Sequence, residues 1–161
     1  MRLFTAAIPP REVREHLAEA LATTSGADWV PQESWHITIG YYGEDDPAAR
    51  APWVRERTQG LAAPRVSLTG AGNFGHTLWM GVSRVDPAFD ALGRALRWND
   101  RHEWHPHLTI GHGDPLALPY ESPEWTINEI VLIGAAQRYE YTVLDRFEFA
   151  AKATSPVPDA P

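Results

Sequence analysis

A short pattern of residues that can move protons and bind phosphate occurs twice in the 161-residue sequence. Both copies read histidine, an aliphatic residue, threonine, isoleucine and glycine, and they begin at His36 and His107, 71 positions apart (107 − 36). Successive side chains of a β-strand point to opposite faces. If both copies are strands, His36 and Thr38 share one face, as do His107 and Thr109, and the aliphatic residues point into a core.

A single His-aliphatic-Thr segment on a half-buried strand is most simply structural, because threonine favours strands and histidine is at home on a solvated face. Two copies with the same Ile-Gly ending change that balance. A duplicated half-domain that folds with two-fold symmetry would bring two imidazoles and two hydroxyls around one cleft. We therefore favour a functional site built from both copies.

Two histidines at one site can divide the work of proton transfer. One accepts a proton from the attacking nucleophile while the other donates one to the leaving group. Their unperturbed pKa near 6.5 keeps both protonation states accessible around neutral pH. Two threonine hydroxyls can donate hydrogen bonds to the non-bridging oxygens of a phosphate. This set suits the in-line opening of a phosphodiester without metal, cofactor or covalent intermediate.

The composition limits the classes of protein that fit. The length suits one domain with a sizeable core, and 43% hydrophobic with 22% charged residues is ordinary for a globular protein. The absence of cysteine excludes disulfides, thiolate catalysis and cysteine zinc sites. The net charge of −7 opposes a broad grip on duplex nucleic acid but allows a short nucleotide end. We find no signal peptide or membrane span, and expect a cytoplasmic monomer.

The hydrophobic patterns predict an α+β fold with mostly antiparallel sheet and one domain over residues 1–150. The tail, residues 151–161, is predicted to be disordered. Helices are expected after Pro10 and after the Asp-Pro pairs at 46–47 and 86–87, where aspartate caps and proline opens the helix. Pro52 is expected to make the second helix short or kinked. Strands are expected at residues 3–8, 29–30, 35–42, 65–69, 76–83, 104–112, 125–134 and 139–149.

The paired motifs make the sequence resemble the two-histidine phosphoesterase superfamily, in particular its bacterial RNA 2′,3′-cyclic phosphodiesterase branch, historically called 2′-5′ RNA ligases. Beyond the two motifs, the segments 2–9, 40–44, 70–82 and 139–149 are also similar to the family, so the resemblance extends over nearly all of residues 1–149. It implies two pseudo-symmetric lobes of mostly antiparallel sheet with outer helices around a central cleft.

The same resemblance implies an activity and roles for the four motif residues. The enzyme would open 2′,3′-cyclic phosphate ends of RNA or nucleotides to 2′-phosphates. His36 would protonate the leaving ribose oxygen, and His107 would activate the water. Thr38 and Thr109 would bind the phosphate. The residues alone do not decide which histidine is the acid and which the base.

Four further residues are candidate substrate contacts. His112 stands where relatives tend to carry arginine, but strict alternation places it on the core face. It reaches the cleft only if the strand bulges or ends at Gly111. Tyr41, Tyr139 and Phe74, the last in a predicted glycine-rich turn, are candidates for stacking on a base.

Two other functions fit parts of the sequence. His102, His105, His107 and His112 are dense enough to suggest a metal-dependent hydrolase, but no carboxylate has matching spacing and the first motif would have no role. A binding module that holds a nucleotide or RNA end without turnover is the other alternative, and the intact pair of motifs argues against it. Four arginines are predicted to be mainly solvated, although one of them can reach a phosphate: residues 84, 97, 101 and 138.

Overall fold

The computed structural model describes residues 1–84, 86–97, 103–138 and 140–149, so the predicted C-terminal tail lies outside the described residues. The main sheet has the strand order β10-β9-β1-β3-β7-β6-β5, and β2 also pairs with β7. Its strands are β1 (Arg2–Ala7), β2 (Ala27–Trp29), β3 (Ile37–Glu44), β5 (Leu68–Phe74), β6 (Thr77–Val82), β7 (His107–Gly113), β9 (Glu129–Gln137) and β10 (Glu140–Glu148). A small second sheet pairs β4 (Arg65–Val66) with β8 (Trp125–Thr126). The helices are α1 (Arg11–Ala22), α2 (Pro47–Thr58), α3 (Pro87–Leu96) and the short 3-10 helix η1 (Gln32–Ser34).

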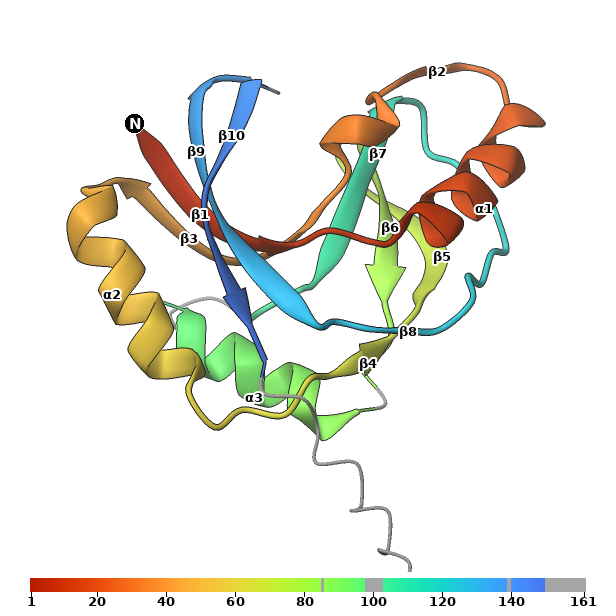
Figure 1. The fold of residues 1–161 in the computed structure, drawn as a ribbon. Coiled ribbons are helices and arrows are strands. Elements are labelled where there is room, and N and C mark those ends of the chain that lie inside the picture. Colours follow the sequence, from red (N-terminus) through yellow and green to blue (C-terminus); the bar gives the residue numbers. More distant parts are fainter. Residues whose placement is uncertain (85, 98–102, 139, 150–161) are drawn as a thin grey trace, which may run out of the picture.

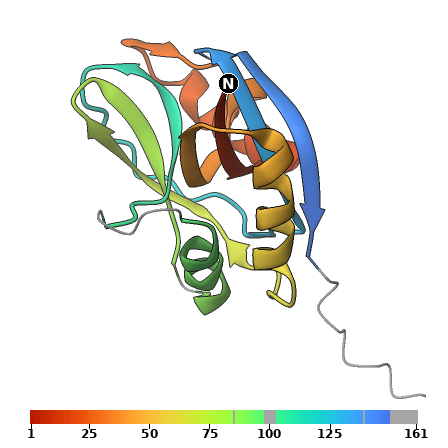
Figure 2. The same cartoon turned by 90° about the vertical axis from the view of Figure 1, so that its left-hand side faces the viewer.

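The strand pairings confirm the predicted α+β class with antiparallel sheet. Every pairing among the described strands is antiparallel. In Figure 1, β10, β9, β1 and β3 form one group and β7, β6 and β5 form the other. Figure 2 shows the same two groups from the side, with α2 and α3 outside the strands.

The two groups of strands meet at a single residue pair. β3 and β7 pair only between Ile37 and Leu108. These two residues hold the same position in the two motifs, because 37 and 108 also differ by 71. A local two-fold axis therefore passes between them, and the strands diverge from it on either side. This is the pseudo-symmetric, two-lobed arrangement that the duplicated motif predicts.

The neighbours of the two motif strands repeat the symmetry. β1 lies beside β3 as β6 lies beside β7. The equivalent cross-strand pairs are Ala7–Ile37, Ala6–Thr38 and Thr5–Gly40 in one lobe, and Met80–Leu108, Trp79–Thr109 and Leu78–Gly111 in the other.

Both motif strands carry a β-bulge at the isoleucine. The register with β1 skips Ile39, and the register with β6 skips Ile110. A bulge inserts one extra residue and so reverses the facing of the residues that follow it, as far as any further bulge. Tyr41 and His112, again 71 positions apart, are thereby turned to the faces of Thr38 and Thr109. Strict alternation was wrong for His112 for this reason.

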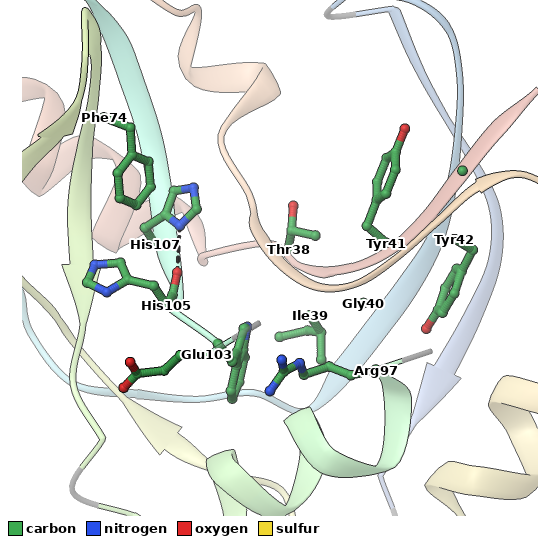
Figure 3. A pocket seen from close by; sticks show the side chains of 12 residues that line it. Thr38, Ile39, Gly40, Tyr41, Tyr42, Phe74, Arg97, Glu103, His105 and His107 are labelled. Carbon is green, nitrogen blue, oxygen red and sulfur yellow. Dashed lines mark hydrogen bonds between the residues drawn. The ribbon is translucent and has the colours of Figure 1, made fainter. Parts of the chain in front are cut away.

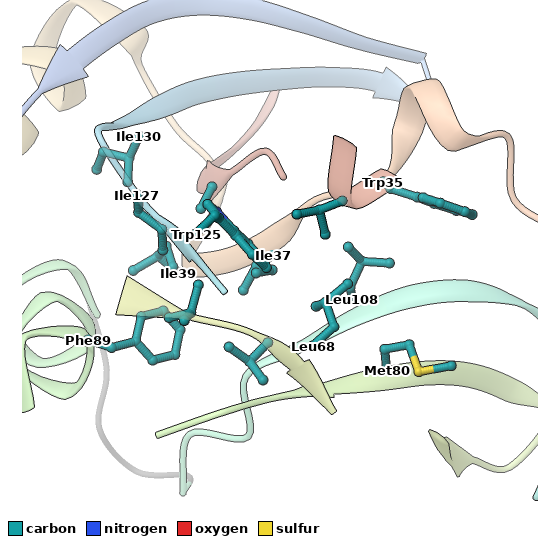
Figure 4. Packing of buried hydrophobic residues seen from close by; sticks show 14 of the residues in the cluster. Trp35, Ile37, Ile39, Leu68, Met80, Phe89, Leu108, Trp125, Ile127 and Ile130 are labelled. Carbon is teal, nitrogen blue, oxygen red and sulfur yellow. The ribbon is translucent and has the colours of Figure 1, made fainter. Parts of the chain in front are cut away.

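The core faces of the motif strands are as predicted. Ile37, Ile39, Leu108 and Ile110 are buried in the main hydrophobic cluster, which Figure 4 shows around the meeting point of the lobes. All three helices contribute buried apolar residues to this cluster: Val13, Leu17 and Leu21 of α1, Val54 of α2, and Phe89, Leu92 and Leu96 of α3. With one face of β3 and β7 packed in this way, the opposite face is left for the histidines and threonines.

The helix starts follow the sequence closely, whereas one helix interior does not. Asp46 accepts a hydrogen bond from Ala48 N at 3.0 Å, and Asp86 caps α3 in the same way. The helix α2 continues to Thr58 despite Pro52, so of the two predicted outcomes, a short or a kinked helix, the short one is wrong. Packing of Val54 in the core stabilises the turns beyond the proline, since tertiary contacts supply most helical stability in proteins.

The β5–β6 hairpin is longer than predicted. Phe74 is the last residue of β5, and only Gly75 and His76 form the turn. The predicted turn over residues 71–75 is mostly strand, because Gly72 pairs with Trp79 and leaves room for its indole. No helix in the described residues has the length and apolar character needed to cross a bilayer.

The glycine that ends the first motif is required by a close approach. A Cβ on Gly40 would lie 2.4 Å from the Leu96 carbonyl oxygen and 2.6 Å from the Tyr42 hydroxyl. We predict that Gly40→Ala lowers the free energy of unfolding by about 1–3 kcal/mol, because a backbone atom must move. Urea unfolding followed by circular dichroism measures this. A change below about 0.5 kcal/mol, typical of surface substitutions, would contradict it.

Candidate active site

The faces of β3 and β7 opposite the core line a cleft. Its largest part has a volume of about 600 Å³ and is here called the His107 pocket. Figure 3 shows Thr38 and Tyr41 on one wall and His107 and Phe74 on the other. The remaining lining residues are Ile39, Gly40, Tyr42, Gly43, Arg97, Glu103, Trp104 and His105.

Two smaller pockets continue the cleft on the side of His36. The Arg2 pocket has a volume of about 220 Å³ and is lined by Arg2, Phe4, His36, Thr38, Tyr41, Ala135, Gln137, Arg138 and Tyr141. The His112 pocket has a volume of about 240 Å³ and is lined by Val30, Ser34, His36, Thr77, Thr109, His112, Arg138 and Tyr141. Shared lining residues join the three pockets, since Thr38 and Tyr41 link the first two, and His36, Arg138 and Tyr141 link the last two.

The two-fold axis determines which motif residues face one another. Continuing the antiparallel register from Ile37–Leu108 places Thr38 opposite His107 and His36 opposite Thr109. The pockets agree, because Thr38 and His107 line one of them and His36 and Thr109 line another. Each histidine therefore lies opposite the threonine of the other motif and lines a pocket with it. The structure brings together all four residues predicted from the repeat.

Each histidine ring is held through the same nitrogen. His36 Nδ1 lies 2.8 Å from the Ser34 carbonyl oxygen, and His107 Nδ1 lies 2.7 Å from the His105 carbonyl oxygen. A carbonyl oxygen only accepts, so Nδ1 donates in both cases. In the neutral ring, Nε2 is then the unprotonated nitrogen that can accept a proton. Both active-site rings thus present the same nitrogen for proton transfer.

Aromatic side chains enclose the two imidazoles. The His36 ring lies 5.0 Å from that of Phe4 and 5.1 Å from that of Tyr141, between ring centroids. The His107 ring lies 5.2 Å from that of Phe74 and 6.0 Å from that of Trp79. These contacts fix the ring orientations and limit the access of water.

This enclosure favours the neutral form of both histidines. Burial lowers the pKa of His36 below its usual 6.5, the Ser34 carbonyl partly opposes this, and the charge of His107 lowers it further. Burial also lowers the pKa of His107, the His105 carbonyl partly opposes this, and the charge of the His105 ring adds to the lowering. Because the charge of His107 affects the pKa of His36, the two rings are close enough to interact electrostatically.

The other candidate contacts have different outcomes. Tyr41 and Phe74 are 57% and 49% exposed and both line the His107 pocket, where a base can reach them. His112 lies in the pocket that contains Thr109. Tyr139 lies outside the described residues.

Two residues at the cleft were not singled out by the sequence. Tyr141 and Arg138 each line both pockets beside His36. The Arg138 Nη2 atom lies 2.8 Å from His112 Nε2. The sequence grouped Arg138 with three other arginines, one of the four being expected to reach a phosphate, and nothing in its local pattern distinguishes it from the others.

The described residues do not assemble the metal site that the histidine cluster suggested. They contain no group of three or more His, Cys, Asp or Glu side chains placed to hold a metal ion. His105 and His107 line one pocket, whereas His112 lines another and contacts the Arg138 guanidinium. His102 lies in a part of the chain that is not described.

The family follows from a comparison with known protein families. The model of the 2′-5′ RNA ligase superfamily matches residues 9–137. The chain belongs to this superfamily. The resemblance read from the paired motifs is thereby confirmed.

Two curated relatives are named RNA 2′,3′-cyclic phosphodiesterase. The protein of Geobacillus stearothermophilus is 31% identical over 133 residues, covering 65% of this chain and 41% of that protein. The protein of Thermotoga maritima is 26% identical over 129 residues, covering 69% of each. The matched region is thus less than half the length of the Geobacillus relative.

Solved structures share the fold. The protein TT0787 of Thermus thermophilus has a TM-score of 0.78 at 23% identity, covering 94% of this chain and 100% of that one. Escherichia coli LigT complexed with ATP has a TM-score of 0.76 at 22% identity, covering 92% and 98%. The two-lobed α+β architecture is therefore common to these structures and to this chain.

The lowered histidine pKa values predict how stability depends on pH. At His36 and His107 the unfolded chain binds more protons than the folded one below about pH 6.5, so these two groups lower the free energy of unfolding as pH falls. We predict that His36→Gln and His107→Gln lose less stability than wild type between about pH 7.5 and about pH 5. Urea unfolding at several pH values measures the slopes.

The exposed His76 in the β5–β6 turn supplies the matched control. His76→Gln should retain the pH slope of the wild-type protein. Equal slopes for wild type, His36→Gln and His107→Gln would show that burial of the two motif rings does not cause the pH dependence of the free energy of unfolding.

Proposed function

We propose that this protein is a metal-independent RNA 2′,3′-cyclic phosphodiesterase. The observation that carries the proposal is that one two-fold axis relates His36 to His107, with each Nδ1 bound to a backbone carbonyl. Membership of the superfamily and the names of the two curated relatives support it. The acidic chain suits a local contact with an RNA end or a small cyclic nucleotide, since a broad basic face is what duplex binding requires.

In the proposed reaction, water attacks the phosphorus and gives its proton to His107 Nε2. The bond from phosphorus to one ribose oxygen breaks, and protonated His36 donates its Nε2 proton to that oxygen. One P–O bond forms, one breaks, and the product is a phosphate monoester. In-line displacement needs the base and the acid on opposite sides of the phosphorus. A phosphate bound on the two-fold axis would have one of the two histidines on either side.

The threonines stabilise the charge that develops on the phosphate. Their hydroxyls are neutral donors, and each lines a pocket together with the histidine of the other motif, so a phosphate bound between the histidines would have one hydroxyl near either side. Donors fixed before the reaction stabilise the transition state without reorganisation. Thr38 and Thr109 therefore contribute binding and orientation, while the histidines move the protons.

The His107 pocket is the proposed place for the nucleoside. The exposed rings of Tyr41 and Phe74 offer surfaces on which a base stacks, a contact typically worth about 1–3 kcal/mol. Stacking tolerates any base, so we expect a weak sequence preference at the RNA end.

Removing either histidine tests the acid–base assignment. We predict that His36→Ala and His107→Ala each reduce kcat for a 2′,3′-cyclic nucleotide by about 10²–10⁴-fold, the usual contribution of a positioned acid or base. Thr38→Val and Thr109→Val should cost less, because they remove hydrogen bonds and not proton transfer. The assay contains a chelator.

The outcomes separate the rival functions. A folded His36→Ala or His107→Ala variant with a rate near wild type would disprove the paired mechanism. Activity lost on chelation would indicate the metal-dependent hydrolase. Binding of the cyclic nucleotide without turnover by the wild-type protein would indicate the binding module.

The identity of the leaving oxygen is a separate prediction. By analogy with the superfamily, the 3′ oxygen should leave and the product should carry a 2′-phosphate. Phosphorus NMR of the product, together with its resistance to a 3′-specific phosphatase, measures this. A 3′-phosphate product would contradict the prediction without affecting the roles of the two histidines.

A further inference from the structure

Arg138 occupies a central position in the half of the cleft that contains His36. It lies in the turn between β9 and β10 and lines both the Arg2 pocket and the His112 pocket. Among the described residues that line the His112 pocket, Arg138 is the one with a permanent charge, and none is acidic. A permanent cation therefore faces the same space as His36 and Thr109.

The contact with His112 shows how the guanidinium is held. Arginine can only donate hydrogen bonds, so Arg138 Nη2 donates to His112 Nε2 over 2.8 Å and that nitrogen is unprotonated. His112 belongs to β7 and Arg138 to the opposite lobe, so the contact spans the cleft. It depends on the bulge at Ile110, without which His112 would face the core.

The reacting group requires such a cation. A cyclic phosphodiester carries one negative charge at any working pH, and more charge develops on its oxygens in the transition state. The threonines and the base His107 are neutral when the substrate binds, and the aromatic rings around His36 disfavour the protonated form that the acid must adopt. An anion placed among neutral groups is costly unless a charge compensates it. Arg138 is placed to supply that charge.

We propose that Arg138 binds the non-bridging oxygens of the scissile phosphate, and that His112 is the positioning residue that orients its guanidinium. This inference rests on the proposed phosphodiesterase function. The planar fork of arginine suits two phosphate oxygens at once, and its charge is independent of pH. Phosphate binding then also links the two lobes, because Arg138 and Thr109 lie on opposite sides of the axis.

The first experiment removes the charge. Arg138→Gln should lower kcat/KM by about 10–150-fold, the loss expected for a hydrogen bond to a charged group. Arg138→Lys should recover only part of this, since lysine lacks the planar fork. Arg11→Gln makes the same change of net charge on the exposed surface of α1, away from the cleft, and should match wild type. Circular dichroism checks that each variant is folded.

The second experiment restores the cation from the other side. In the double variant Arg138→Gln/His112→Arg, the new guanidinium starts from β7 but reaches the same pocket. We expect kcat/KM to recover at least tenfold relative to Arg138→Gln. A merely structural role for Arg138 would depend on the hydrogen bond between the lobes, which Arg138→Met/His112→Arg cannot form because methionine offers no strong acceptor. Equal recovery in that variant would therefore show that the charge, and not the interlobe contact, is what matters.

Binding of inorganic phosphate, measured by calorimetry, distinguishes failure of this inference from failure of the proposed function. The wild-type protein should bind phosphate more tightly than Arg138→Gln, whether or not it turns over a cyclic nucleotide. Equal affinities, or an Arg138→Gln activity within about threefold of wild type, would overturn the role of Arg138. Such results would leave the histidine mechanism intact, because His36→Ala and His107→Ala test it separately.

Discussion

The pairing of Ile37 with Leu108 is the contact on which the site depends. It is the one point at which β3 and β7 pair, and both side chains are fully buried in the core shared by the lobes. Since the two residues are equivalent in the repeat, the axis between them places each histidine opposite the threonine of the other motif. Burial of two aliphatic side chains thus determines the geometry of four polar ones on the reverse face. The strands diverge beyond this contact, and the cleft lies where they separate.

The two bulges turn a symmetric scaffold into an asymmetric site. They occur at the equivalent isoleucines and rotate the equivalent residues Tyr41 and His112 toward the cleft. These residues differ in chemistry: the exposed phenol of Tyr41 lines the His107 pocket, whereas the imidazole of His112 contacts Arg138. A nucleotide is itself asymmetric, with a base on one side of the ribose and a phosphate on the other. Symmetric proton-transfer groups between an aromatic side and a cationic side match that shape.

The electrostatics of the protein are local. The net charge is −7, yet the His112 pocket contains an arginine and no carboxylate among its described lining residues. The positive charge that attracts an anion therefore lies in the cleft and not along the surface. This distribution suits binding of the end of an RNA chain better than binding along its length. Aromatic enclosure of both histidines has two effects. It would strengthen interactions with a phosphate bound there, and burial lowers the pKa of both histidines.

Local patterns in the sequence were enough to predict the core faces of the motif strands, two helix starts and the four motif residues of the site. Alternation placed Ile37, Ile39, Leu108 and Ile110 in the core, Asp-Pro pairs marked two helix starts, and the repeat identified the residues His36, Thr38, His107 and Thr109. Each of these patterns, including each copy of the repeat, is only a few residues long, and over such a length backbone geometry determines which way the side chains face. Tertiary structure decided the rest. The bulges depend on register with β1 and β6, the length of α2 depends on core packing beyond Pro52, and Arg138 meets His112 from the opposite lobe, 26 positions along the chain. Strand alternation contains no information about such contacts, because they arise only when the two lobes pack together.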